Sequence, residues 1–243
     1  MITALKEAWR LIVPPPGDRH GPLSPLLLIL TVVTGTVDAF SYLVLGHVFV
    51  ANMTGNVVFI GFALAGAKGF STGASLTALG AFILGALSSG LLAGRTGPSR
   101  GTLLAATAAI EAVLVAGSIG VAGSVEPSAG AARYGLVVML GLAMGLQNGM
   151  ARRLAVPDLT TTVLTQTITG IAADSRIGGG AGSRIGRRGL SASAMFVGAL
   201  VGAVLVLRAH RPLALLVAVV LLAPAALAAR LLARAGPTWD SPV

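Results

Sequence analysis

The hydrophobic residues of this 243-residue chain fall into eight runs separated by short polar segments. About 20 residues span a bilayer as a helix, so six or seven of the runs are long enough to predict transmembrane helices. The second and sixth runs are short. The eight runs are 23–46, 50–67, 74–94, 102–123, 134–151, 158–174, 189–207 and 212–233.

The sixth run has a composition that fits poorly against lipid. Between Leu159 and Gly170 it holds six threonines and one glutamine in twelve residues. Such side chains need hydrogen-bonding partners that lipid tails do not offer. We therefore expect this segment to be buried in the bundle, to line a cavity, or to enter and leave the membrane on one side.

Polar segments precede and follow the apolar part of the chain. Residues 1–22 are expected to form a cytoplasmic N-terminal segment, which lacks the apolar core and cleavage site of a signal peptide, and residues 234–243 a C-terminal tail. The stretch from Ile2 to Val13 fits a short amphipathic helix on the membrane surface as well as it fits a frayed tail.

The two halves of the chain resemble each other. Asn52–Val58 aligns with Asp158–Leu164, and each stretch follows a glycine-bearing helix with a polar residue near its end, Asp38 in the first half and Asn148 in the second. Internal duplication is common in transporters. Chance similarity between helices rich in glycine and alanine is the alternative.

These observations predict an all-α polytopic membrane protein with a duplicated helical bundle. Its two four-segment repeats are 23–123 and 134–233, and it has six to eight transmembrane helices, with segments two and six short or re-entrant. Eight crossings would place 11 Lys and Arg residues inside and 6 outside, whereas six crossings would place 13 inside and 4 outside. The positive-inside rule thus favours six crossings and inverted repeats, while eight would make the repeats parallel. Both models put both termini in the cytoplasm.

The composition agrees with a membrane protein and excludes several other classes. Charged residues make up 10% of the chain, against about 25% in soluble domains, and hydrophobic residues make up 55%. The absence of cysteine excludes disulfides and thiolate chemistry. The net charge of +9 comes from residues between the apolar runs, which favours membrane anchoring over nucleic-acid binding. With no metal-ligand spacing and no paired catalytic groups, we expect neither a cofactor nor an enzyme.

Two blocks of sequence are specific. They are Gly35–Ala39 with Ala51–Asn56, and Asn148 with Arg152–Leu154 and Val156–Thr165. In these blocks the chain resembles the YoaK-like family of bacterial inner-membrane proteins, and the likeness runs from about Ser24 to Leu232. That family is a domain of unknown function. The resemblance therefore implies a multi-pass protein of the bacterial inner membrane and names no substrate.

Two acidic residues lie inside predicted transmembrane helices. A charge at the centre of such a helix costs about 2.5–3.5 kcal/mol on insertion scales, so it normally has a partner or a function. Asp38 fits a cation or proton site or a contact to a polar solute; alternatively it is hydrated near the interface or pairs with Arg152 or Arg153. Glu111 has no matching acid in the second half, and it either takes part in function or stays protonated and bonds a neighbouring helix.

The polar residues of the two aligned stretches form the other candidate group. Helix starts rich in glycine and threonine expose backbone N–H groups, so two of them meeting at a pseudo-two-fold axis would bind an anion or a zwitterion. Ordinary helix capping is the alternative for Asn52 and Asp158. The residues expected along a substrate or ion pathway are Asp38, Asn52, Thr54, Asn56, Glu111, Asn148, Asp158, Thr160, Thr162 and Gln166.

The function predicted from these features is a small transporter or carrier of a polar small molecule or ion, with its site between the two repeats. Thr54 and Thr160 are then expected on facing helices with their side chains turned inward. A non-transporting membrane assembly or scaffold protein is the alternative. A carrier predicts a shared polar cavity, whereas a scaffold predicts polar groups that neighbouring helices satisfy one by one.

Overall fold

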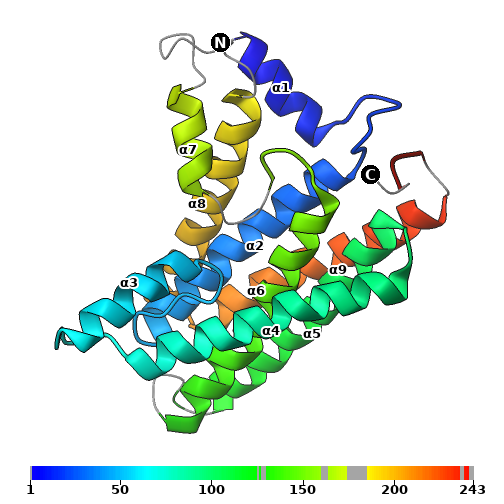
Figure 1. Ribbon diagram of the computed structural model, residues 1–243. Coiled ribbons are helices and arrows are strands. Elements are labelled where there is room, and N and C mark those ends of the chain that lie inside the picture. The colour runs from blue at the N-terminus through cyan, green and yellow to red at the C-terminus, as the bar shows by residue number, and fades with distance from the viewer. Residues whose placement is uncertain are drawn as a thin grey trace.

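A computed structural model of the protein describes residues 2–124, 126, 130–159, 164–173, 185–235 and 238–240. Within these residues the chain is helical and contains no strand (Figure 1). The elements are α1 (Ile2–Ile12), α2 (Leu23–Val44), α3 (Met53–Leu64), α4 (Thr72–Thr96), α5 (Arg100–Ser124), α6 (Gly130–Leu154), α7 (Leu164–Ala173), α8 (Ile185–Arg208), α9 (Pro212–Arg234) and the 3-10 turn η1 (Thr238–Asp240).

Six of the described helices are long and apolar enough to cross a membrane: α2, α4, α5, α6, α8 and α9. The other two apolar runs became short helices, α3 with 12 residues and α7 with 10. At 1.5 Å per residue α3 reaches about 18 Å, roughly half of the hydrocarbon core of a bilayer, so it is too short to cross. The described helices therefore provide six candidate crossings.

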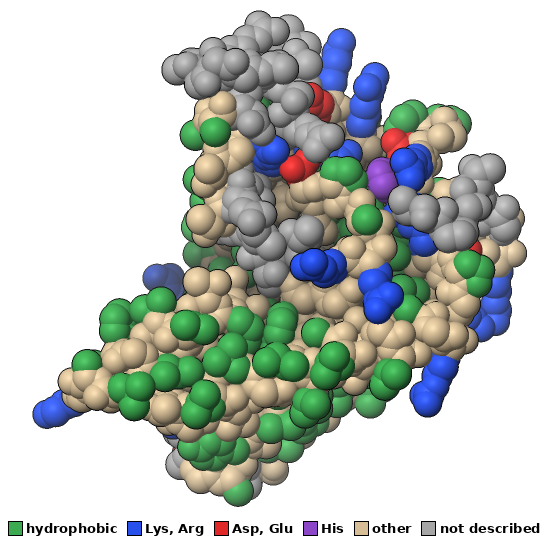
Figure 2. Space-filling view, viewed as in Figure 1, with side chains coloured by type: hydrophobic (Ala, Val, Ile, Leu, Met, Phe, Trp, Pro, Cys, Tyr) green, Lys and Arg blue, Asp and Glu red, His purple; other side chains and the backbone are tan. Residues whose placement is uncertain are grey.

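The centre of the bundle is formed by α2 and α6. In their most apolar windows 72% of α2 and 61% of α6 is buried, against 22–39% for the other four long helices. The helix α4 packs along α6, α8 packs along α2, and α5 and α9 pack against each other. The outer helices keep large apolar side chains exposed, as Figure 2 shows over α4, and these form the surface that lipid would cover. They include Leu84, Leu87 and Leu91 on α4, and Phe196 and Leu200 on α8.

Glycines allow the central helices to lie close to their neighbours. At the four tightest of them an added Cβ would collide with a backbone carbonyl of the facing helix. Small residues at such contacts are typical of helix packing in membranes, where association depends on van der Waals contact rather than on expulsion of water. The contacts are Gly35 with Met195, Gly198 with Val32, Gly85 with Leu142, and Gly145 with Phe82.

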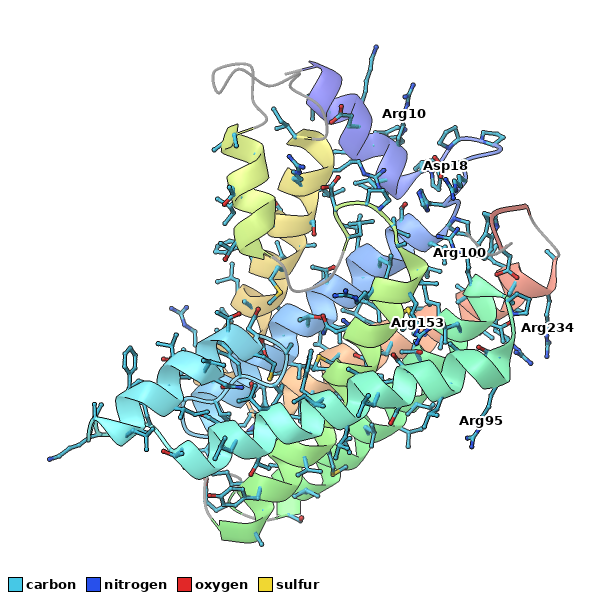
Figure 3. The ribbon with its side chains drawn as sticks, viewed as in Figure 1. Arg10, Asp18, Arg95, Arg100, Arg153 and Arg234 are labelled. Atoms are coloured by element: carbon cyan, nitrogen blue, oxygen red, sulfur yellow. The ribbon has the colours of Figure 1, made fainter. Side chains whose placement is uncertain are left out.

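Several segments meet around Arg100 at one end of the bundle. The Nη1 group of Arg100 donates to the carbonyl oxygens of Arg19 (3.2 Å) and Trp239 (3.1 Å), and Nη2 donates to that of Leu154 (2.7 Å). The N-terminal segment, the α4–α5 loop, the end of α6 and the C-terminal turn η1 therefore lie on the same side. Figure 3 shows Arg95, Arg100 and Arg234 at this end of the bundle.

The opposite end of the bundle holds the loops on either side of α3 and the start of α6. Arg133 donates from Nη2 to the carbonyl oxygen of Gly46 (3.1 Å), and a ring nitrogen of His47 lies 3.0 Å from the carbonyl oxygen of Gly69. Aromatic rings gather there, with Phe49 stacked on Tyr42. Aromatic belts of this kind are common where a membrane protein meets the bilayer interface.

The N-terminal stretch is a helix rather than a frayed tail. The helix α1 lies against α8, and its Leu11 is fully buried. The backbone N–H of Gly186, at the start of α8, donates to the carboxylate of Glu7 (3.2 Å). Leu5 and Trp9 remain largely exposed on the outer face of α1.

Candidate functional site

Asp38 lies on α2 and binds the loop that leads into α3. Its Oδ1 accepts the backbone N–H groups of Val50 (3.0 Å) and Ala51 (2.9 Å), and its Oδ2 accepts the backbone N–H (3.2 Å) and the side-chain amide (2.6 Å) of Asn52. The side chain is buried. Arg152 and Arg153, the partners considered from the sequence, are exposed at the end of α6. Four donors therefore compensate the carboxyl group of Asp38.

Asn56, on α3, also forms hydrogen bonds with the loop between α2 and α3. Its Oδ1 accepts the N–H of Phe49 (3.0 Å), and its Nδ2 donates to the carbonyl oxygen of Phe49 (2.6 Å). Asn56 is fully buried in an otherwise exposed or half-buried helix α3. Asp38, Asn52 and Asn56 thus come together, as expected from the sequence, but around backbone atoms of residues 49–52.

The hydrogen bonds of Asp38, Asn52 and Asn56 form a clamp on residues 49–52. This clamp requires the chain to turn back after α2. Gly46 and His47 both have positive φ values, of 79° and 57°, and they reverse the chain beyond Val44. Residues 50–52 then return to the level of Asp38, about 9 Å before the end of the helix. Asn52 occupies the N-cap position of α3, but its side chain makes no capping hydrogen bond there. Capping, the alternative considered for Asn52, is therefore not what its side chain does.

Thr54 and Asn148, two other residues expected along the pathway, do not join this cluster. Thr54 is exposed on the first turn of α3, so it lacks the inward orientation expected for a site between the two aligned stretches. Asn148 is half-buried on α6, and its Nδ2 donates to the carbonyl oxygen of Met144 in the same helix (2.9 Å).

The second aligned stretch is described only in part. Asp158 has a φ of 62°, and its Oδ1 accepts the Nε–H of Arg188 at the start of α8 (3.0 Å). Both side chains are largely buried, at 12% and 14% exposure. Thr160 and Thr162 lie outside the described residues, as does the side chain of Gln166.

Glu111 belongs to a different cluster, at the centre of the bundle. It lies on α5 and is fully buried, and its carboxyl group faces the amide of Gln147 on α6. The near end of that amide lies 2.8 and 3.1 Å from the two carboxyl oxygens, and the far end lies 2.7 Å from the Oγ1 of Thr34 on α2. One polar chain thus joins three helices.

Two more features complete this cluster. The hydroxyl of Thr34 also lies within hydrogen-bonding distance, 2.9 Å, of the carbonyl oxygen of Leu30. Thr107 lies one turn before Glu111 on α5 and is fully buried, and its Oγ1 has no partner among the described residues. Nothing in the described chain groups three or more His, Cys, Asp or Glu residues as a metal site. The cluster can bind or release a proton and rearrange its hydrogen bonds.

Thr34, Thr107 and Gln147 were not among the residues predicted from the sequence. Gln147 directly precedes Asn148, which was chosen because it aligns with Asp38. Thr34 lies four residues before Asp38 and therefore one turn away on the same side of α2. Amide and hydroxyl groups inside the long apolar helices would have been the signal for these residues.

A second buried polar contact lies at the end of the bundle that holds the termini. The Nη2 group of Arg100 lies 3.1 Å from the Nδ1 of His20. Burial, and next the positive charge of Arg100, lower the pKa of His20 from its ordinary value of 6.5. Both effects disfavour the imidazolium form. This contact holds the N-terminal segment against the start of α5.

An open hollow lies on the outer surface of α1, outside the bundle. It is lined by Leu5, Lys6, Trp9 and Arg10. None of the predicted substrate or ion pathway residues that the structure describes lines this hollow.

Six long apolar helices, four of them packed around the buried α2 and α6, define a polytopic α-helical integral membrane protein. The chain belongs to the family described as "Protein of unknown function (DUF1275)", whose model matches residues 26–228. A similar protein is the "UPF0700 transmembrane protein YoaK" of Bacillus subtilis (strain 168), 33% identical over 153 residues. The match covers 61% of this chain and 65%, less than two thirds, of that relative. The resemblance to the YoaK-like family is thus confirmed. No solved structure matches the chain.

Proposed function

We propose that the protein is a small carrier of a polar solute or ion, and not an enzyme, with Glu111 as its working group. The observation that carries this proposal is a fully buried carboxyl group where three helices meet, bonded to a single amide. Ionisable groups inside a membrane bundle are costly, and they commonly mark the paths of ions and protons. We place the protein in the bacterial inner membrane with both termini in the cytoplasm.

An internal duplication is the architecture proposed for this carrier, with halves 23–123 and 134–233. The packing of the helices supports it, since the contact of α4 with α6 has its counterpart in the contact of α8 with α2. The glycine contacts support it in detail: Gly85 meets Leu142 as Gly198 meets Val32. The same contact at corresponding positions favours duplication over chance similarity of glycine-rich helices.

Inverted repeats follow from this duplication if each half crosses the membrane three times. The ends of the helices support that arrangement, because Arg100 holds the α4–α5 loop beside both termini. In the first half, the return of residues 50–52 to the level of Asp38 starts the short helix α3 below the end of α2, as in a re-entrant segment. Irregular backbone at such depth is tolerated where protein groups satisfy it.

The two halves differ at the proposed site. The buried positions of α2 recur on α6 with a constant register, in which Thr34 corresponds to Met144 and Val37 to Gln147. The buried pattern of α5 recurs on α9 with Glu111 at the position of Leu222. The counterparts of Glu111, Gln147 and Thr34 are therefore Leu222, Val37 and Met144, all apolar and fully buried. A packing requirement shared by both halves does not explain a polar cluster in one alone.

A labelling experiment that needs no knowledge of the solute tests the proposal. The chain has no cysteine, so Thr107→Cys introduces a single thiol beside Glu111. A carrier must open this site to water, so a membrane-impermeant thiol reagent should modify it in vesicles, slowly but measurably. Lys68→Cys, in an exposed loop, should react at once, and Val113→Cys, 71% exposed on the outer face of α5, should stay protected by lipid.

The result contradicts the carrier if Thr107→Cys stays unmodified from both sides of the membrane while Lys68→Cys reacts. Combining Thr107→Cys with Glu111→Gln should change the rate at which the thiol at position 107 is modified, because the carboxyl group of Glu111 then no longer controls the proposed site. Combining it with Glu126→Gln, an exposed glutamate beside Arg211, serves as the matched control.

A non-transporting assembly or scaffold protein is the second candidate, and one observation favours it. The carboxyl group of Asp38 is bonded by four donors of its own chain, as expected of a structural group. In that case Thr107→Cys should be protected from both sides, and the protein should instead be recovered in a complex with a partner.

A further inference from the structure

The amide of Gln147 can satisfy its neighbours in two orientations. In the first, Nε2 points to Glu111 and donates to its carboxylate oxygens, while Oε1 accepts the hydroxyl proton of Thr34. In the second, Nε2 donates to the Oγ1 of Thr34 (2.7 Å), whose own proton goes to the carbonyl oxygen of Leu30 (2.9 Å). Oε1 then faces Glu111, so this orientation needs a proton on the carboxyl group.

We propose that Glu111 is a proton-binding site whose occupancy sets the orientation of the Gln147 amide and, through it, the direction of the hydrogen bond at Thr34. This deepens the function proposed above and rests on it for the use made of the proton, which becomes the coupling ion. On protonation an O–H bond forms at Glu111 with a proton from water, and the carboxyl group changes from one negative charge to none. Gln147 and Thr34 are positioning residues, which transmit that change from α5 through α6 to α2.

Among the groups that surround Glu111, the amide of Gln147 is the partner that can bond a negative charge on the carboxyl group. The helices packed against α5 carry their ionisable groups toward their ends, and α2, which reaches the cluster through Thr34, carries Asp38 one turn away with its four donors. A carboxylate in such a site costs several kcal/mol unless it is well bonded, so a proton is a ligand that the site can hold. The charged residues of those neighbouring helices are Arg133, Arg152 and Arg153 on α6, Arg230 and Arg234 on α9, and Arg95 on α4.

Thr107 is an independent sign that the hydrogen bonds of the cluster change. A buried hydroxyl without a partner destabilises a core that is only structural. Thr107 has such a hydroxyl one turn from Glu111. A second set of hydrogen bonds, formed when the carboxyl group changes its charge, gives that hydroxyl a role.

The glutamine content of the chain makes the switch measurable. Gln147 and Gln166 are its two glutamines, so labelling the glutamine side chains with nitrogen-15 gives two amide signals in the full chain reconstituted in lipid nanodiscs. Gln147→Leu identifies the signal of Gln147, and the signal of Gln166 serves as the reference. We expect the Gln147 signal to move between two positions over about pH 4 to 9, a range that covers buried carboxyl groups. In Glu111→Met, which removes the carboxyl group without adding a glutamine, it should stay in one position.

Further variants test the positioning residues. Thr34→Val removes the hydroxyl at nearly constant shape and should shift the midpoint of the Gln147 transition, while Thr34→Ser should restore it. A Gln147 signal that does not respond to pH, in a protein whose Gln166 signal is that of the wild type, overturns the proposal. So does a signal that moves with added sodium or potassium chloride at constant pH, because the ligand is then a metal ion.

The outcomes separate this proposal from the proposed function. If the Gln147 signal responds to pH while Thr107→Cys stays protected from both sides, the proton site is supported and the carrier function is contradicted. If Thr107→Cys is modified from the water while the Gln147 signal does not respond to pH, the carrier function is supported and the proton is not its coupling ion.

Discussion

Gly85 on α4 and Gly198 on α8 make the same contact with different helices: each approaches a backbone carbonyl of its neighbour so closely that a Cβ would collide with it, at Leu142 for Gly85 and at Val32 for Gly198. Each pair joins an outer helix to one of the two central helices. At each of these contacts the distance between the outer and the central helix therefore depends on the absence of a methyl group.

Alanine at either glycine should destabilise the bundle by a similar amount. Gly85→Ala and Gly198→Ala force backbone apart, and overpacking of this kind typically costs about 1–3 kcal/mol. The measurement is the temperature at which the monodisperse protein in detergent is lost. Gly80→Ala, on α4 with nothing within 4 Å of the added Cβ, should leave that temperature unchanged or raise it slightly. Equal behaviour of all three variants would contradict the close contact.

Asp38 should contribute to the stability of the fold through its hydrogen bonds more than through its charge. Asp38→Ala leaves three backbone N–H groups of the α2–α3 loop without an acceptor, and each costs about 1–3 kcal/mol when buried. Asp38→Asn should be intermediate, since one oxygen remains, and Asn52→Ala, which removes one donor, should be mildest. Thermal stability in detergent ranks the three. If Asp38→Ala is as stable as the wild type, the clamp is not structural.

The loop between α4 and α5 should lie on the cytoplasmic side with both termini. Arg100 bonds both terminal segments, and the positive-inside rule places those segments in the cytoplasm. In intact cells, a membrane-impermeant thiol reagent should therefore modify Lys68→Cys but not Arg95→Cys. In inverted vesicles the pattern should reverse. Modification of Arg95→Cys in intact cells would restore the model with eight crossings.

The stability of the protein should fall as the pH decreases below the ordinary pKa of histidine. His20 has a lowered pKa in the folded chain, so the fold favours its neutral form. Above pH 6.5 His20 is neutral in both the folded and the unfolded chain, and below it the unfolded chain binds the proton more readily. His20→Gln should reduce the loss of thermal stability between pH 7.5 and pH 5.5. His210→Gln, at an exposed position, should not.

The positions of the helices could be predicted closely because each depends on a local property. A long apolar run is a membrane helix in almost any context, and the runs 23–46 and 212–233 became α2 and α9 with shifts of two residues or fewer. The short helix α3 was also visible as a short run. Its depth was not, because that depends on the reversal at Gly46 and His47 and on a carboxyl group on another helix.

The candidate site was only partly predictable. Glu111 was evident as a charge in an apolar helix, and Asp38 likewise, but their partners depend on how α2, α5 and α6 face one another. An amide such as Gln147 costs less to bury than a charge, so it attracts less attention in the sequence. The partners of Asp38 are mostly backbone groups, which no residue type reveals.

The pairing of α2 with α8 also bears on how the protein is made. Thr36 on α2 bonds the carbonyl oxygen of Gly198 on α8, 162 residues later. At synthesis rates of about 5–20 residues per second, α2 leaves the ribosome about 8 to 30 s before its neighbour exists. During that interval the face of α2 that carries Thr36 lacks the helix that covers it in the folded protein. The bundle therefore closes only when the last third of the chain, with α8 and α9, has been inserted.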